Sequence, residues 1–144
     1  MSLLNVPEAI SYTQTPLDVA EPLNIYRSTT EPLSIEVLDT KSQSNPDEPE
    51  WRVMVHATEP LTLYEGDEVR GALNGALYFN HQLIKGSANA QVIGCQSDFI
   101  QGNGGMKSLA ISSEQDFYLN FTPAYDAMEG NYTTTLLWEL VDGY

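Results

Sequence analysis

Gly130-Asn131-Tyr132-Thr133-Thr134-Thr135-Leu136-Leu137-Trp138-Glu139-Leu140, near the end of the chain, is the stretch that decides the fold. Turn residues open it, and a threonine-rich run follows them. Side chains in a β-strand alternate between two faces, so Leu136, Trp138 and Leu140 share one face. The pattern predicts a closing strand that is anchored in a core by a large aromatic side chain.

The same alternation appears in two earlier runs, Leu33–Asp39 and Trp51–Ala57. Their predicted inward faces are formed by Leu33, Ile35 and Val37 and by Trp51, Val53 and Val55. Both runs are typical of half-buried antiparallel strands.

Further strand-like runs recur between turn signals, whereas helical periodicity is nearly absent. The predicted strands are Ala72–Phe79, Ala90–Ile93, Ser108–Ile111, Phe117–Phe121 and Thr133–Val141. The turn signals are Ser42–Glu50, Glu65–Asp67, Gly102–Gly105 and Glu129–Asn131. Ala124–Met128 is too short to form more than a turn, and the proline-rich first thirty residues predict edge strands or a meandering cover. We therefore predict an all-β fold, an antiparallel sandwich or barrel of about seven to nine short strands with negligible helix.

Length and composition indicate one globular domain over residues 1–144, of which 1–3 are either native or a cloning remnant. The chain is 42% hydrophobic, which is too apolar for an intrinsically disordered chain despite a net charge of −14. Six basic residues against twenty acidic ones disfavour nucleic acid, anionic membranes and polyanionic wall polymers as partners. A glycan partner would have to be neutral, cationic or bridged by a metal ion.

The single cysteine, Cys95, excludes an intrachain disulfide and a multi-cysteine metal site, and we expect it to be buried. No stretch approaches the roughly 20 apolar residues of a membrane-spanning helix. The first residues also lack a basic region followed by an apolar core, so no signal peptide is expected. The protein is then either cytoplasmic or a mature exported domain.

Reactive groups are sparse, so we predict no catalytic residues and no cofactor. His56 and His81 lie in separate regions, and His56 falls on the solvated face of its strand. No Gly-x-Ser-x-Gly elbow is present. Gly102–Gly105 lacks the lysine and helix of a phosphate-binding loop and predicts a turn, with Asn103-Gly104 as a hairpin pair.

Acidic loops and aromatic side chains are the remaining candidates for binding. Asp47–Glu50 and Glu65–Glu68 lack the spacing of a calcium loop, so we predict no metal site, although an acidic surface could bind calcium loosely. Trp51 and Trp138 share strand faces with aliphatic residues and are predicted core residues. Surface exposure, which sugar stacking requires, is predicted for Tyr64, Tyr78, Tyr118 and Tyr125.

The C-terminal strand resembles the signature of the WxL family, cell-surface domains of Gram-positive bacteria. Tyr132, Leu136, Trp138 and Leu140 match a Tyr-x-x-x-Leu-Thr-Trp-x-Leu motif. The run beginning Trp51-Arg52-Val53 resembles the family's first Trp-x-Leu strand, with valine in place of leucine. Leu33–Asp39 and Leu73–Leu77 resemble further landmarks in the same order. Leu137 departs from the motif's threonine, so the chain resembles a divergent member.

The resemblance implies non-catalytic, non-covalent attachment to the cell wall, through peptidoglycan or another wall glycan, by a secreted domain at the cell surface. It also implies surface complexes, including one with a WxL-interacting protein, and some members are linked to adhesion. The motif residues Trp51, Val53, Tyr132, Leu136, Trp138 and Leu140 are predicted to be structural, which leaves the ligand surface unassigned.

Two alternatives stay open: a self-assembling pilin-like or coat-like subunit that pairs through an edge strand, and a carbohydrate-binding module that uses surface aromatics.

Overall fold

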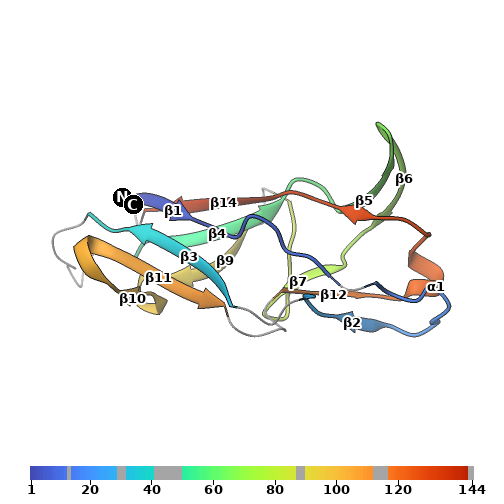
Figure 1. The fold of residues 1–144 in the computed structure, drawn as a ribbon, viewed down its shortest axis with the longest axis horizontal. Coiled ribbons are helices and arrows are strands. Elements are labelled where there is room, and N and C mark those ends of the chain that lie inside the picture. The colour runs from blue at the N-terminus through green and yellow to red at the C-terminus, as the bar shows by residue number, and fades with distance from the viewer. Residues whose placement is uncertain (13, 29–31, 41–49, 87–89, 112–116, 143–144) are drawn as a thin grey trace.

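The protein is an elongated two-layer β-sandwich, seen in a computed structural model that describes residues 1–12, 14–28, 32–40, 50–86, 90–111 and 117–142 (Figure 1). These residues form fourteen strands in four antiparallel sheets. The other regular elements are the 3₁₀ turns Gln96–Asp98 and Asn103–Gly105 and the one-turn helix α1 (Pro123–Asp126). The predicted all-β antiparallel sandwich is therefore confirmed.

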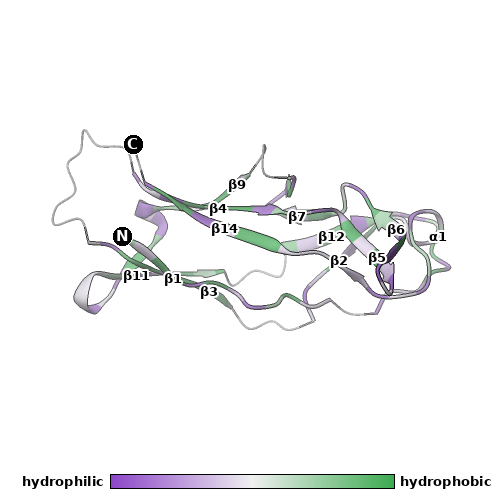
Figure 2. Ribbon diagram, turned by 90° about the horizontal axis from the view of Figure 1, so that it is seen from above, coloured by the Kyte–Doolittle hydropathy of each residue, from purple (hydrophilic) through white to green (hydrophobic). Residues whose placement is uncertain are grey.

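Each layer consists of two sheets that follow one another along the long axis (Figures 1 and 2). The first layer contains, in order, β1 (Ser2–Asn5), β3 (Leu33–Leu38), β11 (Met106–Ile111) and β10 (Ile100–Gln101), and then β2 (Leu23–Ile25), β12 (Phe117–Phe121), β7 (Leu77–Phe79) and β8 (Gln82–Leu83). The second layer contains β14 (Leu136–Val141), β4 (Arg52–Ala57) and β9 (Gln91–Cys95), and then β13 (Tyr132–Thr133), β5 (Leu61–Glu65) and β6 (Glu68–Leu73).

Over the described residues the structure has fourteen strands, whereas about seven to nine were predicted, because some predicted strands are divided in two. The predicted strand Ala72–Phe79 is divided between β6 and β7 by a turn in which Gly75 has a φ of +67°. A residue in the left-handed backbone conformation interrupts the extended strand, and glycine adopts that conformation at little energetic cost. The predicted strand Thr133–Val141 is likewise divided between β13 and β14.

The N-terminal strands lie at sheet edges, as their prolines predicted. β1 is the outer strand beside β3, and β2 is the outer strand beside β12. Of the predicted turn Ser42–Glu50, only Glu50 lies within the described residues. The Gly102–Gly105 turn does join β10 to β11 as a hairpin.

The core lies between the layers and confirms the predicted inward faces of β3 and β4. Ile35, Val37, Trp51, Val53 and Val55 are completely buried. The Trp51 ring meets Phe99 edge-on at a centroid distance of 4.9 Å, and its Nε1–H donates to Asp39 Oδ2 at 3.0 Å. The indole therefore buries its apolar body while keeping its one polar group paired.

The strand that follows Trp51 and the strand that contains Trp138 are neighbours in one sheet. β14 pairs antiparallel with β4, so that Trp138 lies opposite Val55 and Leu140 opposite Val53. Along β14, partly buried and exposed residues alternate from Leu136 to Leu140, which confirms the predicted period of two. Trp138 packs on Phe117 at 6.1 Å.

Cys95, which the sequence predicted to be buried, is partly exposed at the end of β9. Its position at a sheet corner leaves the side chain incompletely covered, and desolvation together with the nearby Asp98 and Glu50 carboxylates raises the pKa of the thiol. Within the described part of the chain, no helix has the length and apolar character to cross a membrane.

Candidate functional site

Three tyrosines form a row across the outer face of the sheet β2-β12-β7. Inward side chains alternate with outward ones along each strand, so the buried Ile25, Leu119 and Phe79 place their neighbours on the outside. We call the resulting surface of Tyr26, Tyr118 and Tyr78 the tyrosine face. All three rings are partly exposed.

The rings of the tyrosine face contact one another. Tyr78 and Tyr118 are directly paired across β7 and β12, and their rings stack at 5.4 Å with an interplanar angle of 11°. Tyr26 tilts against Tyr118 from the other side at 6.3 Å. Cross-strand aromatic pairs of this kind hold their rings in place, so the face is preorganised before any ligand arrives.

Polar groups adjoin the rings at both ends of Tyr118. Two residues along β12, Asn120 Nδ2 donates to Asn24 Oδ1 at 2.7 Å. Each amide has hydrogen-bonding capacity beyond this one bond. His81, in the β7–β8 turn, lies with its Nδ1 at 3.4 Å from the Tyr118 hydroxyl.

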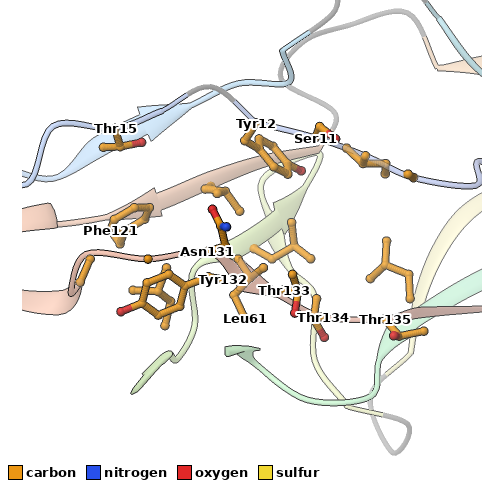
Figure 3. Close-up of a pocket in the computed structure, with 18 of the residues that line it drawn as sticks. Ser11, Tyr12, Thr15, Leu61, Phe121, Asn131, Tyr132, Thr133, Thr134 and Thr135 are labelled. Atoms are coloured by element: carbon orange, nitrogen blue, oxygen red, sulfur yellow. The ribbon is translucent and has the colours of Figure 1, made fainter. Parts of the chain in front are cut away.

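A cleft of about 1000 Å³ opens on one side of the sandwich, beside the β13 end of the second layer (Figure 3). One wall is formed by the N-terminal residues 7–12, 14, 15 and 17, and the other is the segment from Ala127 to Thr135. The floor is apolar and comprises Leu61, Leu73, Leu77, Leu119, Phe121, Leu136 and Trp138. We refer to this feature as the edge cleft.

Each wall of the edge cleft is fixed to its own layer. Tyr12 forms an antiparallel bridge with Arg27, and its hydroxyl donates to the Phe117 carbonyl at 3.4 Å, which attaches the N-terminal wall beyond β2. Burial raises the pKa of the Tyr12 phenol, while the Arg27 guanidinium lowers it to a smaller extent. On the opposite wall, β13 pairs with β5, and the Tyr132 hydroxyl accepts a hydrogen bond from the Met128 N–H at 2.8 Å.

The six motif residues fall in two places. Trp51 and Val53 are buried in the core, whereas Tyr132, Leu136 and Trp138 line the edge cleft and Leu140 packs against the core beside them. The motif thus forms the interior of the second layer and part of the cleft floor.

The other predicted candidates stay apart. Tyr64 is 40% exposed on β5, where its hydroxyl donates to the Glu59 carboxylate, and Tyr125 is 78% exposed on α1. Glu65 and Glu68 form ion pairs with Arg70 at 2.8 and 3.4 Å. Asp47 to Pro49 lie outside the described residues, and within the described ones no three His, Cys, Asp or Glu side chains gather as a metal site would require.

Sequence reasoning found two members of the tyrosine face and missed Tyr26, Asn24 and Asn120. The alternation along Phe117–Phe121 predicts that Tyr118 and Asn120 point outward, but their neighbours on the face depend on which strands pair.

Comparisons with known protein families, with curated proteins and with solved structures find no match for this chain.

Proposed function

We propose that the protein is a non-catalytic cell-surface domain that attaches non-covalently to the peptidoglycan of Gram-positive bacteria and takes part in surface protein complexes. The observation that carries the glycan-binding part is the tyrosine face, a preorganised row of stacked rings on an exposed sheet surface. Sugar rings present apolar C–H faces that stack on aromatic side chains, and neighbouring amides can pair with their hydroxyl groups.

Charge favours the glycan strand of the wall over its anionic polymers. The chain carries twenty acidic and six basic residues, so teichoic acids would be repelled. The resemblance of the two tryptophan-bearing strands to the WxL motifs supports the wall as the location and a WxL-interacting protein as a partner.

Sedimentation with peptidoglycan sacculi that have been stripped of teichoic acids tests the proposal. Wild-type protein should pellet with the sacculi, and Tyr118→Ala should lose at least about tenfold in affinity because the central ring of the row is gone. Tyr118→Phe keeps the ring and should stay within about threefold of wild type. Tyr125→Ala, on the exposed helix α1, is the matched control and should bind normally.

The outcomes separate the alternatives. Failure of the wild-type protein to pellet, or undiminished pelleting of a folded Tyr118→Ala variant, overturns the proposal. Self-association without pelleting would indicate an assembly subunit. Binding to soluble neutral oligosaccharides in an array, without binding to sacculi, would indicate a general carbohydrate-binding module.

A further inference from the structure

The edge cleft lies where the two layers of the sandwich fail to close. Its N-terminal wall continues the sheet β2-β12-β7-β8 outward through the Tyr12–Arg27 bridge. Its opposite wall, β13, has β5 on one side and no other strand of the described chain on the other. The open edge of β13 therefore lies across an apolar floor from a segment that one isolated bridge joins to the other sheet. An edge strand presents backbone N–H and C=O groups that a further strand can pair with.

The floor of the cleft belongs to the core and is incompletely covered. Leu61, Phe121, Leu136 and Trp138 are only partly buried, although they pack against the buried cluster. In a sandwich these inner-face positions are normally closed off by a strand that carries an apolar residue at every second position. An extended peptide would fit both features. Its backbone would form hydrogen bonds with the open edge, and its alternate apolar side chains would cover the apolar floor.

The charged residues of the cleft lining indicate which kind of extended peptide would bind there. Among the described residues that line the cleft, the charged ones are Glu8 and Glu129, one on each wall, and both are exposed. As far as the structure describes the lining, it contains no lysine, arginine or histidine. A peptide that carries basic residues would find a carboxylate on each wall, whereas a second copy of this chain would bring a further net charge of −14.

We propose that the edge cleft is a docking site for an extended, alternately apolar peptide segment with basic ends, supplied by a partner protein, which completes the sandwich by strand addition. This rests on the part of the proposed function that places the domain in protein complexes and is independent of glycan binding. Asn131 occupies the cleft wall with its side chain directed into the opening (Figure 3), so it is the natural position at which to block entry.

The test uses a fluorescent synthetic heptapeptide of alternating valine and threonine with lysine at each end, with binding followed by fluorescence anisotropy. Wild-type protein should bind it, and Asn131→Trp should lower the affinity at least about tenfold by filling the cleft. Gln101→Trp, which adds the same bulk on exposed β10, is the control and should stay within about twofold of wild type. A heptapeptide N-methylated on alternate amides should also lose about tenfold, because strand addition needs those donors.

Reversing the charge of the two carboxylates gives a second test, in which the cleft is not filled by a larger side chain. The double variant Glu8→Lys and Glu129→Lys should prefer a heptapeptide with glutamate ends over one with lysine ends, the reverse of wild type. Both substituted side chains are exposed, so folding should be retained, and a thermal melt checks it.

Four results would overturn the inference. They are no binding by the wild-type protein, equal binding by folded Asn131→Trp, equal binding of the lysine-ended and glutamate-ended peptides, and sedimentation showing that the wild type pairs with itself while Asn131→Trp does not. Sacculus pelleting of the Asn131→Trp variant separates the two proposals. Lost peptide binding with normal pelleting by Asn131→Trp leaves glycan attachment intact, whereas failure of the wild-type protein to pellet while it binds the peptide overturns glycan attachment and leaves the cleft proposal intact.

Discussion

Trp51 and Trp138 occupy the same face of one sheet but are enclosed to different degrees. Trp51 is completely buried and hydrogen-bonded to Asp39, whereas Trp138 is partly buried and borders the edge cleft. Trp51→Ala should therefore lower the free energy of unfolding by about 3 to 5 kcal/mol, and Trp138→Ala by about 2 to 3 kcal/mol. Urea denaturation measures both changes.

Leu137 serves as the control for this pair because it precedes Trp138 on the same strand and is 46% exposed. Leu137→Ala should change stability by less than about 0.5 kcal/mol. A larger loss for Trp138→Ala than for Trp51→Ala would contradict the ranking. A Trp138 variant that keeps its stability yet loses sacculus binding would instead indicate that this indole contacts the glycan.

Tyr12 should make the stability of the protein sensitive to alkaline pH. In the unfolded chain a tyrosine ionises near pH 10, whereas in the folded protein burial raises the pKa of Tyr12. Above that pH the unfolded state loses a proton that the folded state retains, so the free energy of unfolding falls, with a limiting slope for this group of about 1.4 kcal/mol per pH unit. Below about pH 9 this contribution is constant.

Tyr12→Phe should reduce the alkaline loss of stability because no ionisable group remains at the site. Chemical denaturation between pH 8 and about 11 compares the two slopes. Tyr64 acts in the same direction, since its hydrogen bond to Glu59 also raises the pKa of its phenol, so Tyr12→Phe should remove part of the slope. An unchanged slope in Tyr12→Phe would show that Tyr12 does not contribute.

Among the elements, the β10–β11 hairpin contains two adjacent glycines with different roles. Gly104 and Gly105 both have positive φ, at +66° and +82°. A Cβ on Gly104 would meet no atom within 4 Å, whereas one on Gly105 would lie 2.8 Å from the Asp39 carbonyl oxygen. Gly104→Ala should cost about 1 kcal/mol for its backbone conformation alone, and Gly105→Ala about 2 to 3 kcal/mol.

The Trp51 indole reports the difference between the two hairpin variants. Asp39 receives the Trp51 Nε1–H and donates its own backbone N–H to the Gly105 carbonyl at 2.9 Å. Displacement of Asp39 by Gly105→Ala should therefore shift the indole N–H resonance, while Gly104→Ala leaves it in place. Equal stability losses in the two variants would show that the close approach to Asp39 is unimportant.

Strands with regular alternation were predictable from sequence, and those with an irregular pattern were not. β3, β4 and β12 each place apolar side chains at every second position, which is the signal that sequence reasoning uses. β5 breaks that rule because Thr62 and Leu63 are both buried, and its pairing with β6 shifts register between Leu63 and Tyr64. The sequence therefore does not predict β5 or the first half of β6, although the predicted turn at Glu65–Asp67 is confirmed as the connection between them.

For the whole molecule, the sequence predicted the class of fold but not the surfaces that could bind a partner. Exposure of Tyr78 and Tyr118 followed from strand alternation, yet their alignment with Tyr26 depends on the order β2-β12-β7, which joins segments far apart in the chain. The edge cleft was less predictable still. It arises between the edge strand β13 and the N-terminal segment, and no local pattern in the sequence specifies which sheet edges remain open.

The edge strand β1 begins and the edge strand β14 ends at the same end of the long axis (Figures 1 and 2). A mechanical load applied between them would act across the sandwich instead of along it. The outer strands would then peel from β3 and β4 one hydrogen bond after another, so they should yield at lower force than strands that must slide past each other in shear. The opposite end, with α1, would carry none of that load until the first strands had separated.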